Sequence, residues 1–143
     1  MTHKRAILAL LLWLGTALPA GAAEFQYRNL DEALQLAGAE NKQVMMFFWA
    51  EWCAYCDLLR NEVFSDPEIQ KVFDLDFLAV SVNIEKDPEG LAARYRPRAL
   101  PTLPLPTLVF LNPDGGIAGY LPGAVDGGTF LKVLAYLVEN RNK

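Results

Sequence analysis

The only two cysteines of this chain, Cys53 and Cys56, are separated by two residues and follow an apolar run. The run at 44–49 has the bulky apolar character of a buried strand, and the segment 57–62 is expected to be helical. A turn between such a strand and a helix places Cys53 at the helix N-terminus. Unpaired N–H groups and the helix dipole favour a thiolate at that position. The pair therefore predicts thiol–disulfide chemistry.

Residues 1–23 are predicted to be a cleavable signal peptide. A positively charged start at 3–5 precedes an apolar stretch at 6–17, and the small residues at 19–23 suit cleavage. The apolar stretch is shorter than the roughly 20 residues that a membrane span needs, so no stable membrane anchor is expected. We therefore expect an exported protein whose single domain is residues 24–143.

Removal of this segment changes the charge of the chain. The formal net charge of −4 falls to −6 because Lys4 and Arg5 are lost. Such an acidic protein is not expected to bind nucleic acid or an anionic membrane surface. His3, the single histidine, is lost as well, so neither a Cys–His dyad nor a histidine-bearing metal site is expected.

A structural role and a zinc-binding role for the cysteine pair are both weaker hypotheses than redox chemistry. A structural disulfide across so short a loop is expected to contribute only about 2 kcal/mol. Zinc needs about four ligands, and the predicted mature chain offers no further cysteine or histidine. Linear copper(I) coordination by Cys53 and Cys56 stays open, because soft thiolates select copper(I).

Helices and strands are expected to alternate along the chain. One helix is capped by Asn29 or Asp31, and another begins at Ser65 or Asp66. Strands are expected at 43–50, 77–84, 107–111 and 117–121, and further helices at 57–62, 89–95 and 126–140. A Pro- and Gly-rich turn at 112–116 is expected to join the last two strands as a hairpin.

This order of elements resembles the thioredoxin fold over residues 27–140. The resemblance rests on Trp-Ala-Glu-Trp-Cys-Ala-Tyr-Cys at 49–56, on Pro106-Thr107 at the start of a strand, and on the 112–116 hairpin. The segment 56–68 is most similar to exported thioredoxin-like reductases, such as the soluble C-terminal domain of the membrane electron carrier DsbD. The resemblance implies an α/β thioredoxin fold: a central mixed sheet flanked by helices, with the cysteine pair at a helix N-terminus.

The resemblance also implies roles for single residues. Cys53 would be the nucleophile, and Cys56 the resolving thiol that releases the substrate from a mixed disulfide. A cis-proline is expected to face the cysteines, and both Pro101 and Pro106 follow a leucine and precede a threonine. We favour Pro106, because a central strand that contained both Pro104 and Pro106 would lose ladder donors.

The expected substrate contacts surround the cysteines and this proline. Leu105 would present its backbone to an extended partner strand, and Trp52 would supply apolar area beside Cys53. The predicted substrate-binding residues are Trp52, Tyr55, Leu105, Pro106 and Thr107.

The chain departs from thioredoxin in one respect that concerns proton transfer. Phe47 stands where thioredoxins place a buried aspartate that helps to move the proton of the resolving thiol. The sequence therefore assigns no proton path to Cys56.

The absence of a histidine beside Cys53 favours electron donation, since strongly oxidising relatives use one to stabilise the thiolate. We expect a monomeric periplasmic protein-disulfide reductase with no cofactor beyond the Cys53–Cys56 disulfide. Its expected partners are disulfide-bonded exported proteins and a membrane thiol electron donor. The alternatives are a dithiol oxidase or isomerase, a copper(I)-binding module and a redox-inert docking module.

A basic patch is formed by Arg94, Arg96 and Arg98, next to a Pro- and Leu-rich segment at 98–105. The patch is consistent both with steering of an anionic partner and with an ordinary solvated face. The segment is consistent both with a docking wall and with a tolerated loop insertion. The sequence leaves both questions open.

Overall fold

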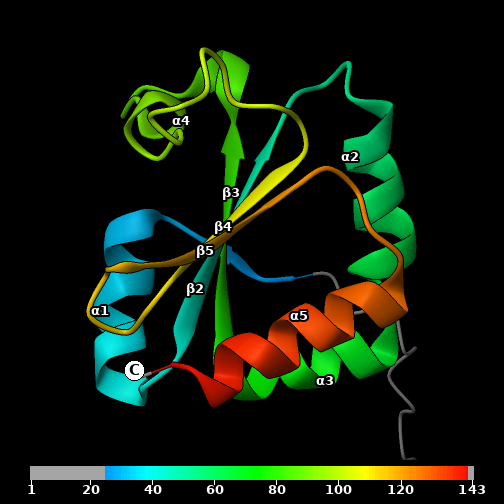
Figure 1. Ribbon diagram of the computed structural model, residues 1–143. Helices are drawn as coiled ribbons and strands as arrows, with labels where there is room; N and C mark the ends of the chain where they lie inside the picture. Colours follow the sequence, from blue (N-terminus) through cyan, green and yellow to red (C-terminus); the bar gives the residue numbers. More distant parts are fainter. Residues whose placement is uncertain (1–24, 142–143) are drawn as a thin grey trace, which may run out of the picture.

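The apolar runs of the chain form one five-stranded sheet in a computed structural model that describes residues 25–141 (Figure 1). The predicted signal peptide, residues 1–23, lies outside the described residues. The strands are β1 (Tyr27–Arg28), β2 (Gln43–Trp49), β3 (Phe77–Asn83), β4 (Thr107–Leu111) and β5 (Ile117–Pro122). The α-helices are α1 (Leu30–Glu40), α2 (Ala54–Leu58), α3 (Pro67–Asp76), α4 (Leu91–Arg94) and α5 (Gly127–Glu139). A π-helical turn η1 (Leu59–Val63) continues α2, and a 3-10 turn η2 (Ile84–Lys86) follows β3.

The sheet is mixed, with the strand order β1-β3-β2-β4-β5. Strand β2 runs parallel to β3 and antiparallel to β4, while β1 and β5 form the edges. All of β2 except Trp49 is buried, which explains the uninterrupted apolar sequence from Val44 to Trp49. The sheet and the flanking helices confirm the predicted thioredoxin fold.

Helices cover both faces of this sheet because the side chains of β2 alternate between them. Met45 and Phe47 point to the face packed by α2, η1, α3 and α5. Val44, Met46 and Phe48 point to the opposite face, where α1 and α4 pack. Figure 1 shows these two groups of helices on opposite sides of the sheet. In the described residues, no helix combines the length and apolar character that a membrane crossing requires.

Aromatic rings fill the core on the α3 and α5 face. Phe25 stacks on Phe73 with ring centroids 4.0 Å apart, and Phe73 stacks on Phe77 at 5.1 Å. Phe64 links Phe47 in the sheet, at 5.2 Å, to Phe130 in α5, at 5.8 Å. This network fixes η1, which follows the cysteine helix, against the sheet.

Side-chain caps determine where the long helices begin. Asn29 caps α1 by accepting the N–H of Glu32 at 2.8 Å, so Asn29 rather than Asp31 is the cap. Asp66 caps α3, while the hydroxyl of Ser65 donates to the Asn61 carbonyl at 2.5 Å. The N-caps are therefore Asn29 for α1 and Asp66 for α3, one of the two candidates predicted for each helix.

Some boundaries differ from the sequence-based expectation. The cysteine helix begins at Ala54 rather than 57, because Cys53 itself is the cap. The short helix is limited to Leu91–Arg94 and starts after Gly90, which has a left-handed φ of 65°. Strand β3 ends one residue early, where the Asn83 side chain accepts the N–H of Glu85 at 2.9 Å and starts η2.

Replacement of Phe130 by alanine is expected to lower the free energy of unfolding by about 3–5 kcal/mol, because it empties a fully buried aromatic site. Urea denaturation measures the loss. Tyr136→Ala on the same helix is the matched control; since its side chain is 65% exposed, a change within about 0.5 kcal/mol is expected. Equal losses in the two variants would contradict the assignment of α5 as a core helix.

The cap of α5 predicts a pH dependence of stability. The Asp126 carboxylate accepts the Thr129 hydroxyl at 2.7 Å and the Thr129 N–H at 2.9 Å, and these bonds lower the pKa of Asp126 below its usual 3.8. A lowered folded pKa contributes stability above the unfolded pKa, and this contribution is lost as the pH falls through the folded pKa. Asp126→Asn keeps a capping side chain without a titrating group.

Denaturation of both proteins between pH 7 and pH 2 measures this effect. We expect wild type to lose stability relative to Asp126→Asn as the pH drops below about 4. Parallel pH profiles of the two proteins would show that the Asp126 charge does not contribute.

Candidate active site

The end of β2 and the start of α2 place the cysteine pair at the end of the sheet where the central strand β2 finishes. Cys53 has an extended backbone (φ −90°, ψ 94°) and occupies the N-cap of α2. Its Sγ accepts the N–H of Cys56 at 3.2 Å, and its carbonyl accepts the N–H groups of Cys56 and Asp57 at 3.0 and 3.3 Å. The first turn of the helix therefore directs its N–H groups at Cys53, as the sequence predicts.

The two sulfurs form a disulfide, with the Cα atoms 5.2 Å apart. Cys53 is 6% exposed and Cys56 is fully buried. Of the two residues, only Cys53 has surface exposed to solvent, so a reactant approaches the disulfide from the Cys53 side. This asymmetry fits the predicted division into an attacking and a resolving cysteine, a division that stays a prediction.

Exposed apolar side chains surround the disulfide. Trp52 and Tyr55, which precede and follow Cys53, are 69% and 68% exposed, and Leu58 one turn later is 41% exposed. Trp49 differs from them because its ring is half-buried and its Nε1–H donates to the Ser81 Oγ at 2.8 Å. Trp52 and Tyr55 are therefore available to a partner, whereas Trp49 is tied to the sheet.

A second segment reaches the site from the start of β4. The Leu105–Pro106 peptide bond is cis, so Pro106 rather than Pro101 has this geometry. The Pro106 carbonyl accepts the Gly123 N–H at 2.7 Å, which joins this turn to the end of β5. Thr107 is buried, and its hydroxyl donates to the Pro104 carbonyl at 2.6 Å, so its side chain supports the turn from within.

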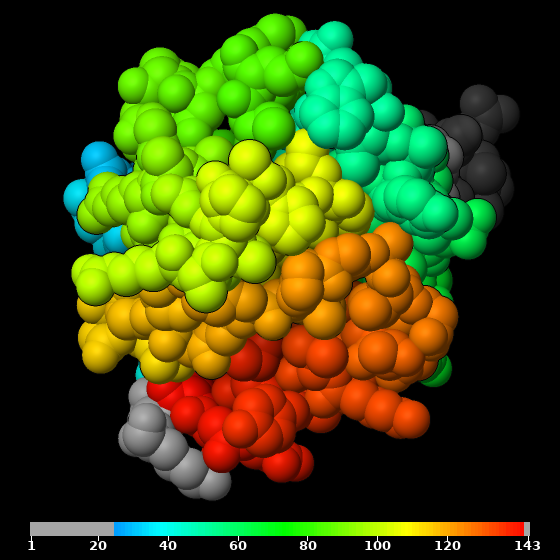
Figure 2. Space-filling view, turned by 45° about the horizontal axis from the view of Figure 1, so that its top comes forward, coloured from blue at the N-terminus to red at the C-terminus, as the bar shows by residue number. Residues whose placement is uncertain are grey.

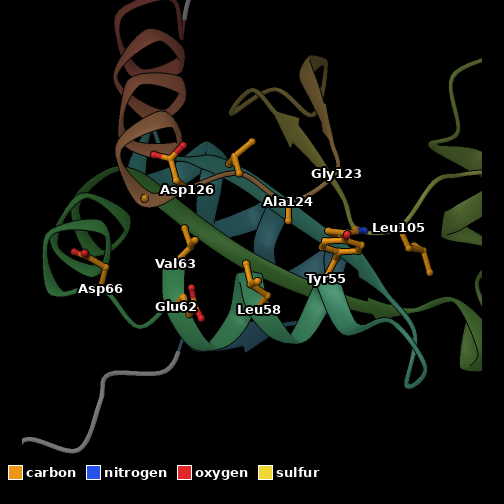
Figure 3. A pocket seen from close by; sticks show the side chains of 12 residues that line it. Tyr55, Leu58, Glu62, Val63, Asp66, Leu105, Gly123, Ala124 and Asp126 are labelled. Carbon is orange, nitrogen blue, oxygen red and sulfur yellow. The ribbon is translucent and has the colours of Figure 1, made fainter.

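A groove of about 570 Å³ extends away from the disulfide between α2, η1 and the segment before α5 (Figure 3). Its lining residues are Tyr55, Leu58, Glu62, Val63, Asp66, Leu105, Pro106, Gly123, Ala124, Val125, Asp126 and Gly127. Figure 3 shows Tyr55 and Leu105 near one end and Glu62, Asp66 and Asp126 toward the other. Trp52 lies outside this lining.

Only one end of this groove, at Tyr55, Leu105 and Pro106, was predicted from the sequence. Leu58 and Glu62 could have been found, because they follow Tyr55 at the helical spacings i+3 and i+7 and so share its face. No sequence pattern places the segment 123–127 in this groove, because it is far from the cysteines along the chain and approaches η1 only in the folded protein.

Phe47 is fully buried below the cysteine helix, and its ring lies against an arginine. The Arg60 guanidinium is 5.5 Å from the centroid of Phe47 and 4.6 Å from that of Trp49. It also forms an ion pair with Asp57 at 3.1 Å. The position of the thioredoxin aspartate thus holds an aromatic ring beside a cation. Arg60 was not singled out from the sequence.

The turn before Cys53 is connected to η2. The Glu51 N–H donates to the Glu85 carboxylate at 3.3 Å, and the Lys86 ammonium pairs with the Glu51 carboxylate at 2.8 Å. The hydrogen bond from Lys86 lowers the pKa of Glu51, and the same bond raises the pKa of Lys86. These contacts join the end of β3 to the active-site turn.

Known proteins share this arrangement. The family model of the thioredoxin-like domain matches residues 30–138. The thiol:disulfide interchange protein DsbD of Salmonella typhimurium is 33% identical over 106 residues, which are 71% of this chain and 18% of that protein. The chain thus spans about a fifth of the length of such relatives.

Solved structures agree with the family match. A thioredoxin from Thermus thermophilus is 35% identical, with a TM-score of 0.67 over 80% of this chain and 88% of that chain. The oxidised C-terminal domain of Neisseria meningitidis DsbD is 25% identical, with a TM-score of 0.59 over 83% of this chain and all of that domain. With its fold, its Cys-x-x-Cys pair and these matches, the chain belongs to the thioredoxin-like domain family of thiol–disulfide oxidoreductase relatives.

Proposed function

We propose that this protein reduces disulfides of exported partner proteins in the periplasm. The observation that carries the proposal is the Cys53–Cys56 disulfide at the N-terminus of α2, with only the Cys53 sulfur near the surface. The similarity to DsbD and its C-terminal domain supports dithiol exchange and export. The absence of histidine from the sequence after His3 supports the reducing direction, since no imidazolium stabilises the Cys53 thiolate.

The reaction starts from the reduced dithiol. The Cys53 thiolate attacks one sulfur of the partner disulfide, the partner S–S bond breaks, and a Cys53–partner mixed disulfide forms. The partner sulfur that leaves takes up a proton. The deprotonated Cys56 sulfur then attacks Cys53 Sγ, which breaks the mixed disulfide and releases the second partner thiol. Two electrons and two protons have passed to the partner, and the protein holds the Cys53–Cys56 disulfide.

The surroundings of Cys53 hold the partner during this exchange. Leu105 presents its backbone to an extended partner segment, and Pro106 forms the apolar wall next to it. Trp52 and Tyr55 cover the adjoining partner side chains with aromatic surface. These contacts orient the partner sulfur toward Cys53 and require no cofactor beyond the disulfide.

Continuous turnover needs a dithiol donor, because each cycle leaves the protein oxidised. A membrane thiol protein of the exporting cell fits this role, since the periplasm is kept oxidising. The donor attacks the Cys53–Cys56 disulfide by the same exchange in reverse, becomes oxidised and restores both thiols.

Trapping of the mixed disulfide tests the proposal. Reduced Cys56→Ser protein is expected to accumulate a one-to-one covalent complex with a disulfide-bonded peptide, because nothing resolves it. Cys53→Ser is the matched control and is expected to form at least about tenfold less complex, since its remaining thiol is buried. Mass spectrometry under non-reducing conditions measures both complexes.

Reduced wild-type protein is expected to release two peptide thiols per Cys53–Cys56 disulfide formed. Equal trapping by the two serine variants, or no release of peptide thiols by wild type, would contradict the proposed function. Net oxidation of peptide dithiols with no reduction of peptide disulfides would favour the oxidase alternative.

A further inference from the structure

We infer that the partner segment docking at Cys53 carries opposite charges on its two sides: basic residues where it lies in the groove and acidic residues where it faces the 95–105 segment. This inference rests on the proposed function and names the class of partner that it serves.

The groove is acidic at the end remote from the disulfide. Glu62, Asp66 and Asp126 line it there, and its lining contains no cation (Figure 3). Asp66 and Asp126 also cap α3 and α5, so their charges are partly offset by helix N-termini. Glu62 is exposed and caps no helix, and within residues 25–141 its side chain forms no hydrogen bond or ion pair. Glu62 is therefore the carboxylate that a partner cation would meet.

The other side of the site has the opposite charge. From Gly90 to residue 113 the sequence contains three arginines and no acidic residue, although the chain as a whole is acidic. Arg94 and Arg98 are exposed, while Arg96 donates to the Leu100 carbonyl. Figure 2 shows the 95–105 segment (yellow-green to yellow) running across this face as far as the α2 region (blue-green).

The 95–105 segment connects the arginines to the groove, because Leu105 at its end and the following Pro106 both line the groove. Helix α4, which leads into the arginines, packs on one face of the sheet, and the groove lies on the face covered by α2 and α5. The 95–105 segment runs from the α4 side to the start of β4, at one end of the sheet (Figure 1). A partner strand that passes Leu105 thus extends toward the carboxylates in one direction and toward the arginines in the other.

The helical rise sets the spacing on the acidic side. Tyr55 lies in α2 and Glu62 in the π-helical turn η1 that continues it, so Glu62 follows Tyr55 by about two helical turns along the groove. An extended partner segment covers about 10 Å in three residues. We therefore place the partner's lysine or arginine three positions from its cysteine, which docks beside Tyr55.

Reduction of three model peptides tests the inference. Each peptide carries a central cysteine in a disulfide with a fluorescent reporter thiol. The flanks are Lys-x-x-Cys-x-x-Glu, Glu-x-x-Cys-x-x-Lys, or glutamine at both charged positions. Reporter release by the reduced wild-type protein in a single turnover gives a second-order rate constant for each peptide. One charge order should be reduced at least about threefold faster than the other, and this preference should shrink at high salt because the charges are exposed.

A double charge reversal identifies the residues responsible. Glu62→Lys combined with Arg98→Glu should invert the preferred order. Glu139→Lys combined with Lys71→Glu makes the same two charge changes at exposed positions away from the site, and should keep the wild-type preference.

Equal rates for the two charge orders, or the same preference in both double variants, would overturn the inference and leave the proposed function intact. A wild-type protein that reduces none of the three peptides, including the uncharged one, would instead overturn the proposed function and the inference with it.

Discussion

The capping of α2 by Cys53 is the interaction on which the site depends. Cys53 sits where a buried strand ends and a helix begins, so its sulfur receives an N–H of the first helical turn and lies near the surface. Cys56 lies one helical turn after Cys53 and is buried, because it packs into the hydrophobic core. The attachment of η1 to the sheet through Phe64 holds this helix in place, so core packing also positions the sulfur chemistry.

The rest of the site is assembled from segments far apart in the chain. Pro106 comes from the turn before β4, and Gly123 from the end of β5 bonds to its carbonyl. Because β4 pairs antiparallel with β2, the turn before β4 lies at the same end of the sheet as the cysteines that follow β2. The groove then follows from α2 and α5 packing on the same face. The domain thus holds its disulfide beside a groove that carries carboxylates at its far end.

Much of this was predictable because the signals are local. The apolar runs of β2, β3 and β4, the caps at Asn29 and Asp66, and the turn at 112–116 are each contained in a few adjacent residues. Strand β1 has only two residues and is defined by its pairing with β3, so it is too short to show the alternating pattern of a strand in the sequence. Arg60 and the segment 123–127 were missed because their roles come from contacts across the fold.

The reduction potential of the Cys53–Cys56 pair tests the central claim most directly. Equilibration of the protein in graded thiol buffers, with the fraction of disulfide measured at each step, gives this potential. A reductase whose attacking thiolate lacks strong stabilisation should have a value near or below about −230 mV. A value above about −150 mV would contradict the account, since such a disulfide would accept electrons from its partners rather than donate them.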